Sequence, residues 1–571
     1  MTLVARVRQH LVETYATLDE RSLGLGRMVL AAALLADLGK RVPHLRTWYT
    51  NEGLLPNHTT LWSPPYEHTF SLFFMASHWY EAAFGFALCA LAYLALFVGY
   101  RTKLAQLASF VAVLSLHGRV MFIGIGGDIV LSSLVFWTLF LPLGRRFSVD
   151  SLIDELRSLA REEPRAERPS GVTHLACFAL LLQLSTIYFL NAWQKNGPMW
   201  LDGTLVHYVL ELDPIATRYA VALRGELTPG LTALLTHAAR AAEATIPVLL
   251  LFPVFTRFAR PLALLSIAGL HAGFSLLMNV GLFSLAMICY APFLVPGALF
   301  DAWAKRGARG KTKKPERPRA RLFAERVRRI AAEPESLRSV LPKMPFGKTL
   351  LEVASLPYGA RLFVGLARAA VGRAERVEAA ARRSVSTPPH PSDGVWLRRL
   401  PPLAVALALY ASAAQAGAEN PIIPERFRPP QPAFCGALVH YLQLYQGWRM
   451  FAPEAMRGDF MLTVDAVTRD GRHVDPWNEL TRPGRPPPGE RIPTRLGYDV
   501  YVNNYYGRIV ETPAYHPAFA DWVLRYHERT GRPEDQIVSF TASLLLDESP
   551  PPGEREPRKQ RKQVFLKHPQ N

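Results

Sequence analysis

Ionisable side chains inside long apolar runs are the first candidates for chemistry in this sequence. Charges within a bilayer are costly, so such residues are rare and commonly mark functional sites. The most informative segment begins at Tyr188 and ends at Lys195, with Trp193 and Trp200 on either side of the lysine. A lysine amine in a dry pocket loses the solvation of its charged form and can act as a base. The alternative is a lysine that reaches the lipid headgroups, which is the commoner situation at the end of a span.

A second group of ionisable residues follows helical spacing. His237, Arg240 and Glu243 stand at positions i, i+3 and i+6, which places them on one side of a single helix. One interpretation is a wall of an internal polar cavity. The other is a buried ion pair and a hydrogen-bonded histidine that fix helix packing. The spacing favours neither interpretation over the other.

Three further residues could line the same cavity. Asp128 follows Gly126 and Gly127, where a flexible turn could deliver its carboxylate, although a cap on the first helical turn is the favoured explanation. A lone histidine in a membrane span, such as His271, is usually a packing residue with its hydrogen bonds satisfied. Because Lys195 is expected in the same outer half of the membrane, His271 is also a candidate to line a cavity. We predict Lys195, His271 and Asp128 as catalytic residues. The residues predicted to line the cavity are Arg119, His237, Arg240, Glu243 and Trp200.

The elements that must position these residues are membrane spans. Residues 22–303 form one apolar segment after another, and several runs approach the roughly 20 residues that a span needs. We predict about nine spans. They are 22–42, 77–99, 102–121, 126–143, 171–193, 230–255, 260–279, 281–303 and 399–417.

Charge and cysteine content exclude other classes. The net charge of +18 could indicate nucleic acid, but the excess lies in loops on one side, and no basic motif interleaved with aromatic residues is present. The four cysteines form no CxxC pair, so neither a disulfide framework nor a zinc site is predicted. Basic loops predict a cytoplasmic N-terminus and an extracytoplasmic C-terminus.

The remaining segments complete an all-α polytopic membrane domain with a small α+β extracytoplasmic domain. Residues 1–21 have the spacing of an amphipathic helix on the membrane surface. Residues 304–398 form a basic cytoplasmic linker that leads to the last span. In the tail, 418–571, alternation at 459–467 before the turn 469–472 predicts a hairpin; 536–546 predicts a strand and 517–529 a short helix.

The sequence resembles the HTTM (horizontally transferred transmembrane) domain proteins, bacterial relatives of the vitamin K-dependent γ-carboxylase. Five stretches carry the resemblance: Arg27-Met-Val-Leu with Asp37; Gly126-Gly-Asp128 leading to Leu141-Pro142 and Ser148-Val-Asp150; Tyr188-Phe189 through Lys195 to Trp200 and Gly203; His271 through Gly281-Leu-Phe283 to Ala291-Pro292; and Trp448-Arg-Met-Phe-Ala-Pro453 with Asp470-Gly471-Arg472. Together they span most of the chain except the linker.

The resemblance implies a function and a cofactor. In the carboxylases of this family, a lysine after the Tyr-Phe segment deprotonates vitamin K hydroquinone, and Lys195 matches that position. Reduced vitamin K or another quinone would be the cofactor, and a periplasmic protein or peptide the substrate. The chain departs from the carboxylase pattern at Gly126-Gly127-Asp128, where the family has an Asn-His pair.

Two other functions stay open beside the enzyme. A non-catalytic membrane scaffold would present the C-terminal domain to a periplasmic or surface partner. A carrier for a lipid or small solute is less favoured, since no inverted repeat or pair of broken helices is evident in the sequence. Besides the bilayer, a quinone and a periplasmic protein or peptide are the predicted partners, and nucleic acid is not.

Overall fold

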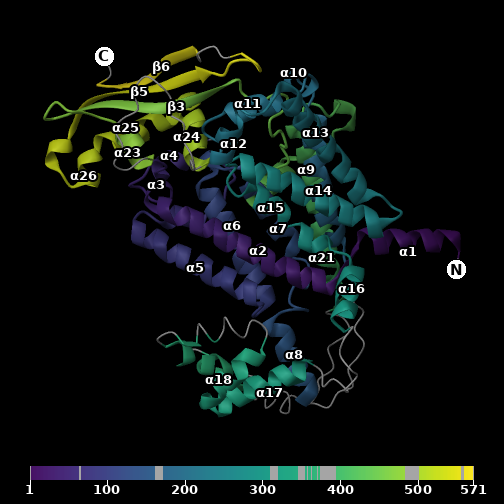
Figure 1. The fold of residues 1–571 in the computed structure, drawn as a ribbon. Helices are drawn as coiled ribbons and strands as arrows, with labels where there is room; N and C mark the ends of the chain where they lie inside the picture. Colours follow the sequence, from purple (N-terminus) through teal and green to yellow (C-terminus); the bar gives the residue numbers. More distant parts are fainter. Residues whose placement is uncertain are drawn as a thin grey trace.

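The computed structural model describes residues 2–63, 66–160, 171–308, 319–344, parts of 351–372, 394–481, 500–554 and 559–569. These residues are mostly helical, with a four-stranded sheet near the C-terminus (Figure 1). The helices form a bundle in the middle of the molecule, and the sheet lies at one end of it. Parts of two predicted regions lie outside the described residues: 309–318, 345–350 and 373–393 of the linker, and 482–499 of the tail.

Six helical segments are long and apolar enough to cross a membrane. They are Glu20–Tyr49, which comprises α2 (Glu20–Arg41), η1 (Val42–His44) and α3 (Leu45–Tyr49); α5 (Trp79–Val98); α9 (Leu175–Trp193); α13 (Pro229–Leu251); α14 (Thr256–Leu277); and Leu400–Glu419 of α21 (Gly394–Glu419). A pair of helical segments, Phe283–Leu294 and Gly297–Trp303, could form a seventh span with a bend of 76°. These helices are the mark of a multi-pass membrane protein.

Two of the nine predicted spans, 102–121 and 126–143, correspond neither to these six segments nor to the bent pair. The segment 126–143 forms α7 (Gly126–Thr138), whose 13 residues reach only about 20 Å, against a hydrocarbon core of about 30 Å. The segment 102–121 forms α6 (Thr102–Arg119), which carries polar residues such as Gln106, Ser109 and Ser115 along its length. Both helices are largely buried, with α5 packed against α6. They fall short of the length or the apolar composition of the six segments above.

The sheet near the C-terminus is antiparallel, with the strand order β4-β3-β5-β6. Its strands are β3 (Gly458–Thr468), β4 (His473–Val474), β5 (Ile537–Glu548) and β6 (Lys559–His568). The predicted hairpin is confirmed by β3 and β4, and the predicted strand at 536–546 by β5. Strand β6 escaped prediction because its charged sequence, typical of a sheet edge, lacks apolar alternation.

Helices lie between this sheet and the bundle (Figure 1). They are α23 (Pro476–Thr481), α24 (Val500–Glu511), α25 (His516–Leu524) and α26 (Tyr526–Thr530), the last two covering the predicted helix at 517–529. An aromatic core holds them together: Trp477 lies 5.4 Å from Tyr505 and 6.1 Å from Phe519, centroid to centroid. The tail therefore has the predicted mixture of helix and strand.

The chain between α21 and the sheet packs into the bundle and contacts its helices. After α22 (Ala433–Leu442), Gln443 donates a hydrogen bond of 2.9 Å to the Leu114 carbonyl of α6. Gln446 exchanges hydrogen bonds of 3.0 Å with Gln183 of α9. The bundle and the tail consequently share a buried polar interface.

The opposite end of the bundle carries the described part of the linker. Helices α8 (Val149–Ala160), α17 (Arg319–Ala332) and α18 (Leu337–Val340) lie there, away from the sheet (Figure 1). Near that end, α1 (Leu3–Tyr15) projects from the bundle and exposes Leu3, Val4 and Val7, as an amphipathic surface helix would. The structure also contains β1 (Thr17–Asp19), α4 (Asn57–Thr60), β2 (Gly171–Thr173), α10 (Pro198–Leu201), α11 (Leu205–Glu211), α12 (Arg218–Leu223), α15 (Phe283–Ile288) and α16 (Gly297–Ala308).

Candidate functional site

Lys195 and Glu243 form an ion pair inside the bundle. Lys195 follows the last turn of α9, and its Nζ meets Oε2 of Glu243, which comes from the middle of α13. The two side chains are only 2% and 3% exposed. Asn191, one turn before Lys195, donates a hydrogen bond of 3.2 Å from Nδ2 to the same carboxylate oxygen. Lys195 therefore points into the protein and does not reach toward headgroups.

An aromatic ring covers the ammonium group of Lys195. Its Nζ lies 4.4 Å from the centroid of Trp200, which α10 supplies, and a cation attracts the electron-rich face of such a ring. The indole N–H of Trp200 donates a 2.7 Å hydrogen bond to the carbonyl of Phe451. The segment around Phe451 thus fixes the ring, and the ring fixes the lysine.

A pocket of ≈ 280 Å³ opens beside the ion pair. Its walls are mostly apolar, and Lys195 and Glu243 bring the only charged side chains among its lining residues. The space exists because small residues meet between two helices: Ala238 and Ala242 on α13 face Gly269 and Gly273 on α14. A pocket of this composition suits an apolar molecule with one polar group placed at the ion pair.

The pocket is open on the side where α13 and α14 leave the rest of the bundle. Ala238 and Gly269 are exposed, and most of the surface of both helices is free of protein contact. In a bilayer, such a helix surface faces lipid. A lipophilic molecule could therefore enter from the membrane between α13 and α14.

His271 of α14 lies in the same region but binds another partner. Its Nε2 is 2.7 Å from the hydroxyl of Tyr188, and its ring contacts Phe274 and Phe283. The Nδ1 atom has no hydrogen-bond partner in the described part of the chain. The neighbours of His271 on α14, Leu270 and Phe274, line the pocket, whereas His271 itself does not. The imidazole lies behind the wall of the pocket.

Asp128 belongs to a second buried cluster of charge. Arg41 of α2 places Nη2 2.9 Å from Oδ1 of Asp37 and 2.7 Å from Oδ1 of Asp128. His117 of α6 adds Nε2 at 3.1 Å from Oδ2 of Asp37. The predicted N-cap role of Asp128 is wrong, because Ile125 is the N-cap of α7 and Asp128 stands at the third position of the helix, where its carboxylate accepts the backbone N–H of Ile125. The hydroxyl of Tyr501, from α24 of the tail, donates to Asp128 at 3.3 Å.

The oxygen and nitrogen atoms of this second cluster could in principle bind a metal. One ligand atom each from Asp37, His117 and Asp128 lies within 4.8 Å of the others. However, the guanidinium group of Arg41 already contacts both carboxylates and so provides the cation. Sequence reasoning missed His117 and Arg41 as partners of Asp128, although Asp37 stood out within its apolar run.

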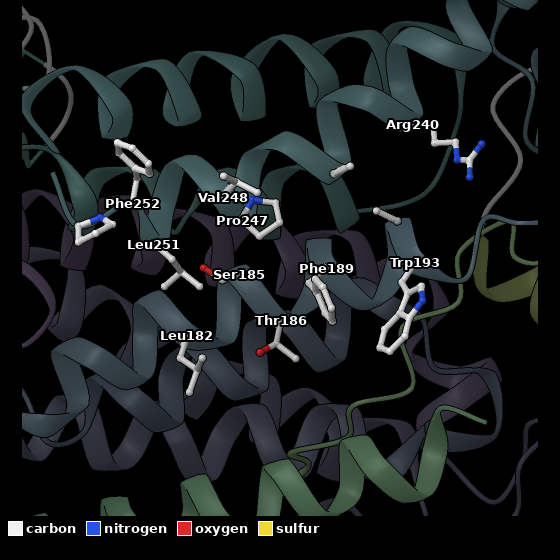
Figure 2. Close-up of a pocket in the computed structure, with 13 residues that line it drawn as sticks. Leu182, Ser185, Thr186, Phe189, Trp193, Arg240, Pro247, Val248, Leu251 and Phe252 are labelled. Atoms are coloured by element: carbon white, nitrogen blue, oxygen red, sulfur yellow. The ribbon is translucent and has the colours of Figure 1, made fainter. Parts of the chain in front are cut away.

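The other predicted cavity residues lie elsewhere. His237 is exposed, and Arg240 lines a separate hollow between α9 and α13 (Figure 2). Arg119 is buried and donates a 2.6 Å hydrogen bond from Nη2 to the carbonyl of Leu55, with its guanidinium 5.9 Å from the ring of Phe74. Of the predicted set, the structure brings together Lys195, Glu243 and Trp200, with His271 close by.

Comparison with known proteins adds no relative: no family model matches the chain, and no curated protein or solved structure is significantly similar to it.

Proposed function

We propose that the protein is a membrane enzyme in which Lys195 and Glu243 carry out acid–base chemistry on a lipophilic hydroxyl compound of the quinol class. The observation that carries the proposal is the buried Lys195–Glu243 pair beside an apolar pocket that opens toward lipid. A buried ion pair is a weak contribution to stability, since desolvation offsets most of the attraction. Its position beside free space fits a chemical role better than a structural one.

The pair can supply a base without any net change of charge. Transfer of one proton from the Lys195 ammonium to the Glu243 carboxylate leaves a neutral amine and a neutral acid. In a dry site this neutral form competes with the ion pair, because both charges lose their hydration. The amine then accepts the proton of a substrate hydroxyl, and the ammonium that results stays next to the new oxyanion.

The resemblance to HTTM proteins gives the proposal its substrate class. Lys195 follows the Tyr-Phe segment as the carboxylase base does, and a quinone, when bound, would supply the redox chemistry. The finer proposal is a carboxylase-like reaction at the outer face of a bacterial inner membrane, with an extracytoplasmic tail and a protein or peptide substrate. His271 and Tyr188 would then orient groups behind the pocket wall.

The test compares three forms of Lys195 in purified protein supplied with reduced quinone. Lys195→Ala removes the amine, and we expect turnover to fall by about 10²–10⁴-fold, the usual contribution of a general base. Lys195→Arg keeps the positive charge opposite Glu243 but cannot give up a proton, so it should fold normally and still be inactive. Quinol oxidation or carbon dioxide incorporation is the measurement.

The matched control is Lys103→Ala. This exposed lysine of α6 donates to the carbonyls of Leu139 and Leu141, and none of these residues lines the pocket, so its loss should leave turnover intact. Activity retained by Lys195→Arg would remove Lys195 from the chemistry. The non-catalytic scaffold predicts a different result: Lys195 variants keep the phenotype, and only deletion of 418–571 abolishes it.

A further inference from the structure

A second, larger hollow lies on the other side of α13 from the Lys195 pocket. Its volume is ≈ 740 Å³, and α9 and α13 form its walls (Figure 2). The floor is apolar, with Leu182, Phe189, Val248 and Leu251 among its lining residues. Phe189 and Val248 are 50% and 60% exposed, so the hollow faces outward. In a membrane protein an outward-facing apolar hollow is filled by lipid.

One end of the hollow carries a positive charge. Arg240 lines it there, and Figure 2 shows Arg240 and Trp193 at the same end of the hollow, on its two opposite sides, with Phe252 at the other end. Arg240 is half-buried, and no hydrogen bond or ion pair to it is found among the described residues. Tryptophan and arginine are the side chains that accumulate at the level of lipid headgroups. The charged end therefore has the character of a headgroup site.

The dimensions agree with an acyl chain. From Arg240 to Leu251 the helix rises by about 17 Å at about 1.5 Å per residue. Trp193, which lines the same end of the hollow, is the last residue of the span α9, so we place this end at the level where α9 leaves the bilayer, with the first half of α13 continuing beyond it. Half of a hydrocarbon core of about 30 Å is about 15 Å, which is the depth that one acyl chain occupies. Pro247 and the small side chain of Ala244 keep α13 from filling this length.

We propose that the hollow between α9 and α13 is a binding site for an anionic phospholipid, with one acyl chain against Leu182, Phe189 and Val248 and the phosphate at Arg240. The occupant is a phospholipid because the site pairs an apolar trough with a cation that lacks a protein partner among the described residues. A neutral isoprenoid tail would use the trough and leave Arg240 unpaired. The inference is independent of the Lys195 pocket, which lies on another face of α13.

The experiment measures bound lipid on the full-length protein. Purified protein is incorporated into nanodiscs of phosphatidylcholine that contain a minor fraction of phosphatidylglycerol, released, and analysed by native mass spectrometry. We expect wild type to retain phosphatidylglycerol in preference to phosphatidylcholine. Arg240→Gln should lower the retained phosphatidylglycerol by about fivefold, the contribution of one basic residue near an anionic lipid.

Two matched controls separate the site from general effects. Arg257→Gln removes an exposed arginine of α14 outside the hollow and should leave retention unchanged. Ala244→Trp fills the hollow and should lower retention, whereas Leu265→Trp on the exposed surface of α14, outside the hollow, should not. Equal retention of the two lipids, no effect of Arg240→Gln, or a neutral isoprenoid found in place of phospholipid would each overturn the proposal.

Discussion

The bundle holds two buried clusters of charge that differ in what surrounds them. Lys195 and Glu243 stand alone beside a pocket of ≈ 280 Å³. Arg41, Asp37 and Asp128, with His117, lie among tightly packed helices, and none of these side chains lines one of the pockets described above. The first cluster has space for a substrate beside it, and the second lines none of these pockets of the described residues.

Hydrogen bonding shows that the groups of the second cluster are also fully partnered. Gln443 donates through Nε2 to the Leu114 carbonyl, and its Oε1 accepts the hydroxyl hydrogen of Ser132 at 3.0 Å. The hydroxyl oxygen of Ser132 lies 2.9 Å from Nδ1 of His117, and Nε2 of the same ring lies 3.1 Å from Asp37. The cluster therefore continues from Arg41 and its two carboxylates through His117 to Gln443.

The comparison teaches how a buried charge can be assigned a role. A cluster with every group paired, and with members from α2, α6, α7 and α24, fixes how these helices and the tail fit together. A pair next to open space can exchange partners when a molecule arrives. The stability of the protein should depend mainly on the paired cluster around Arg41, and its activity on the Lys195–Glu243 pair.

The largest expected effect is the loss of stability in Arg41→Met. This substitution leaves two buried carboxylates without the guanidinium that pairs with both of them, which should cost about 3–5 kcal/mol of the free energy of unfolding. The four cysteines are buried, so their reaction with a thiol dye during heating reports unfolding. The control is Lys40→Met, which replaces an exposed residue of the same helix. An unchanged melting temperature in Arg41→Met would break the distinction between the two clusters.

A carboxylate outside the bundle sharpens the comparison because its hydrogen-bond donors among the described residues are amide groups. Asp475 accepts the backbone N–H groups of Val464 and Asn478 at 3.2 and 2.9 Å, and no ion pair to it is found in the described part of the chain. Burial raises the pKa of Asp475 to about 6, although the hydrogen bonds oppose the rise. Folding then favours the protonated acid.

The pH dependence of the tail follows from this shift. Its stability should be greatest below about pH 4, where Asp475 is protonated in both states. Stability should fall as the pH rises through about 6, by on the order of 3 kcal/mol, and stay level above that. The fluorescence of the buried Trp477 during unfolding measures the change. In Asp475→Asn the slope between about pH 4 and 6 should disappear, and a slope that persists would assign it to another group.

A smaller loss of stability is expected when the Lys195–Glu243 pair is broken. Lys195→Met and Glu243→Gln should each lower stability by about 1–3 kcal/mol, because the partner left behind can lose its charge by proton exchange. The double variant should be more stable than the sum of the two predicts, by about 0.5–3 kcal/mol, because the residues are in contact. Strict additivity in thermal unfolding would show that the two charges do not interact.

Much of the fold could be predicted from apolar runs, but how many of these runs cross the membrane could not. A hydropathy window reports that a segment avoids water, and it does not report whether lipid or protein surrounds the segment. The predicted spans at α5 and α9 match helices that are long and apolar enough to cross a membrane, whereas α6 and α7 are apolar helices that fall short of that length or composition. Strand β6 was not predicted because its charges, which sit on a sheet edge, hide it from a search for apolar alternation.

The candidate site could be predicted only as far as single segments reach. The tryptophans around Lys195 identified it as unusual, and Trp200 does lie over its ammonium group. Helical spacing grouped Glu243 with His237 and Arg240, but spacing along one helix cannot reveal a partner on another. Glu243 meets Lys195, which lies 48 positions away in the chain. Contacts of this kind depend on how helices pack, and one sequence does not encode that in a local pattern.

The smallest expected effect concerns the ring that covers the lysine. Trp200→Leu removes the cation–π contact and should lower stability by about 1 kcal/mol, near the middle of the range for partly desolvated pairs. Trp200→Phe keeps an aromatic face but loses the hydrogen bond to Phe451, so thermal unfolding of the two variants separates the ring from the bond. If Trp200→Phe is the more stable variant, the ring holds the ammonium in place. If both variants lose the same stability, the hydrogen bond to Phe451 is what closes the site, and Lys195 is held by Glu243 alone.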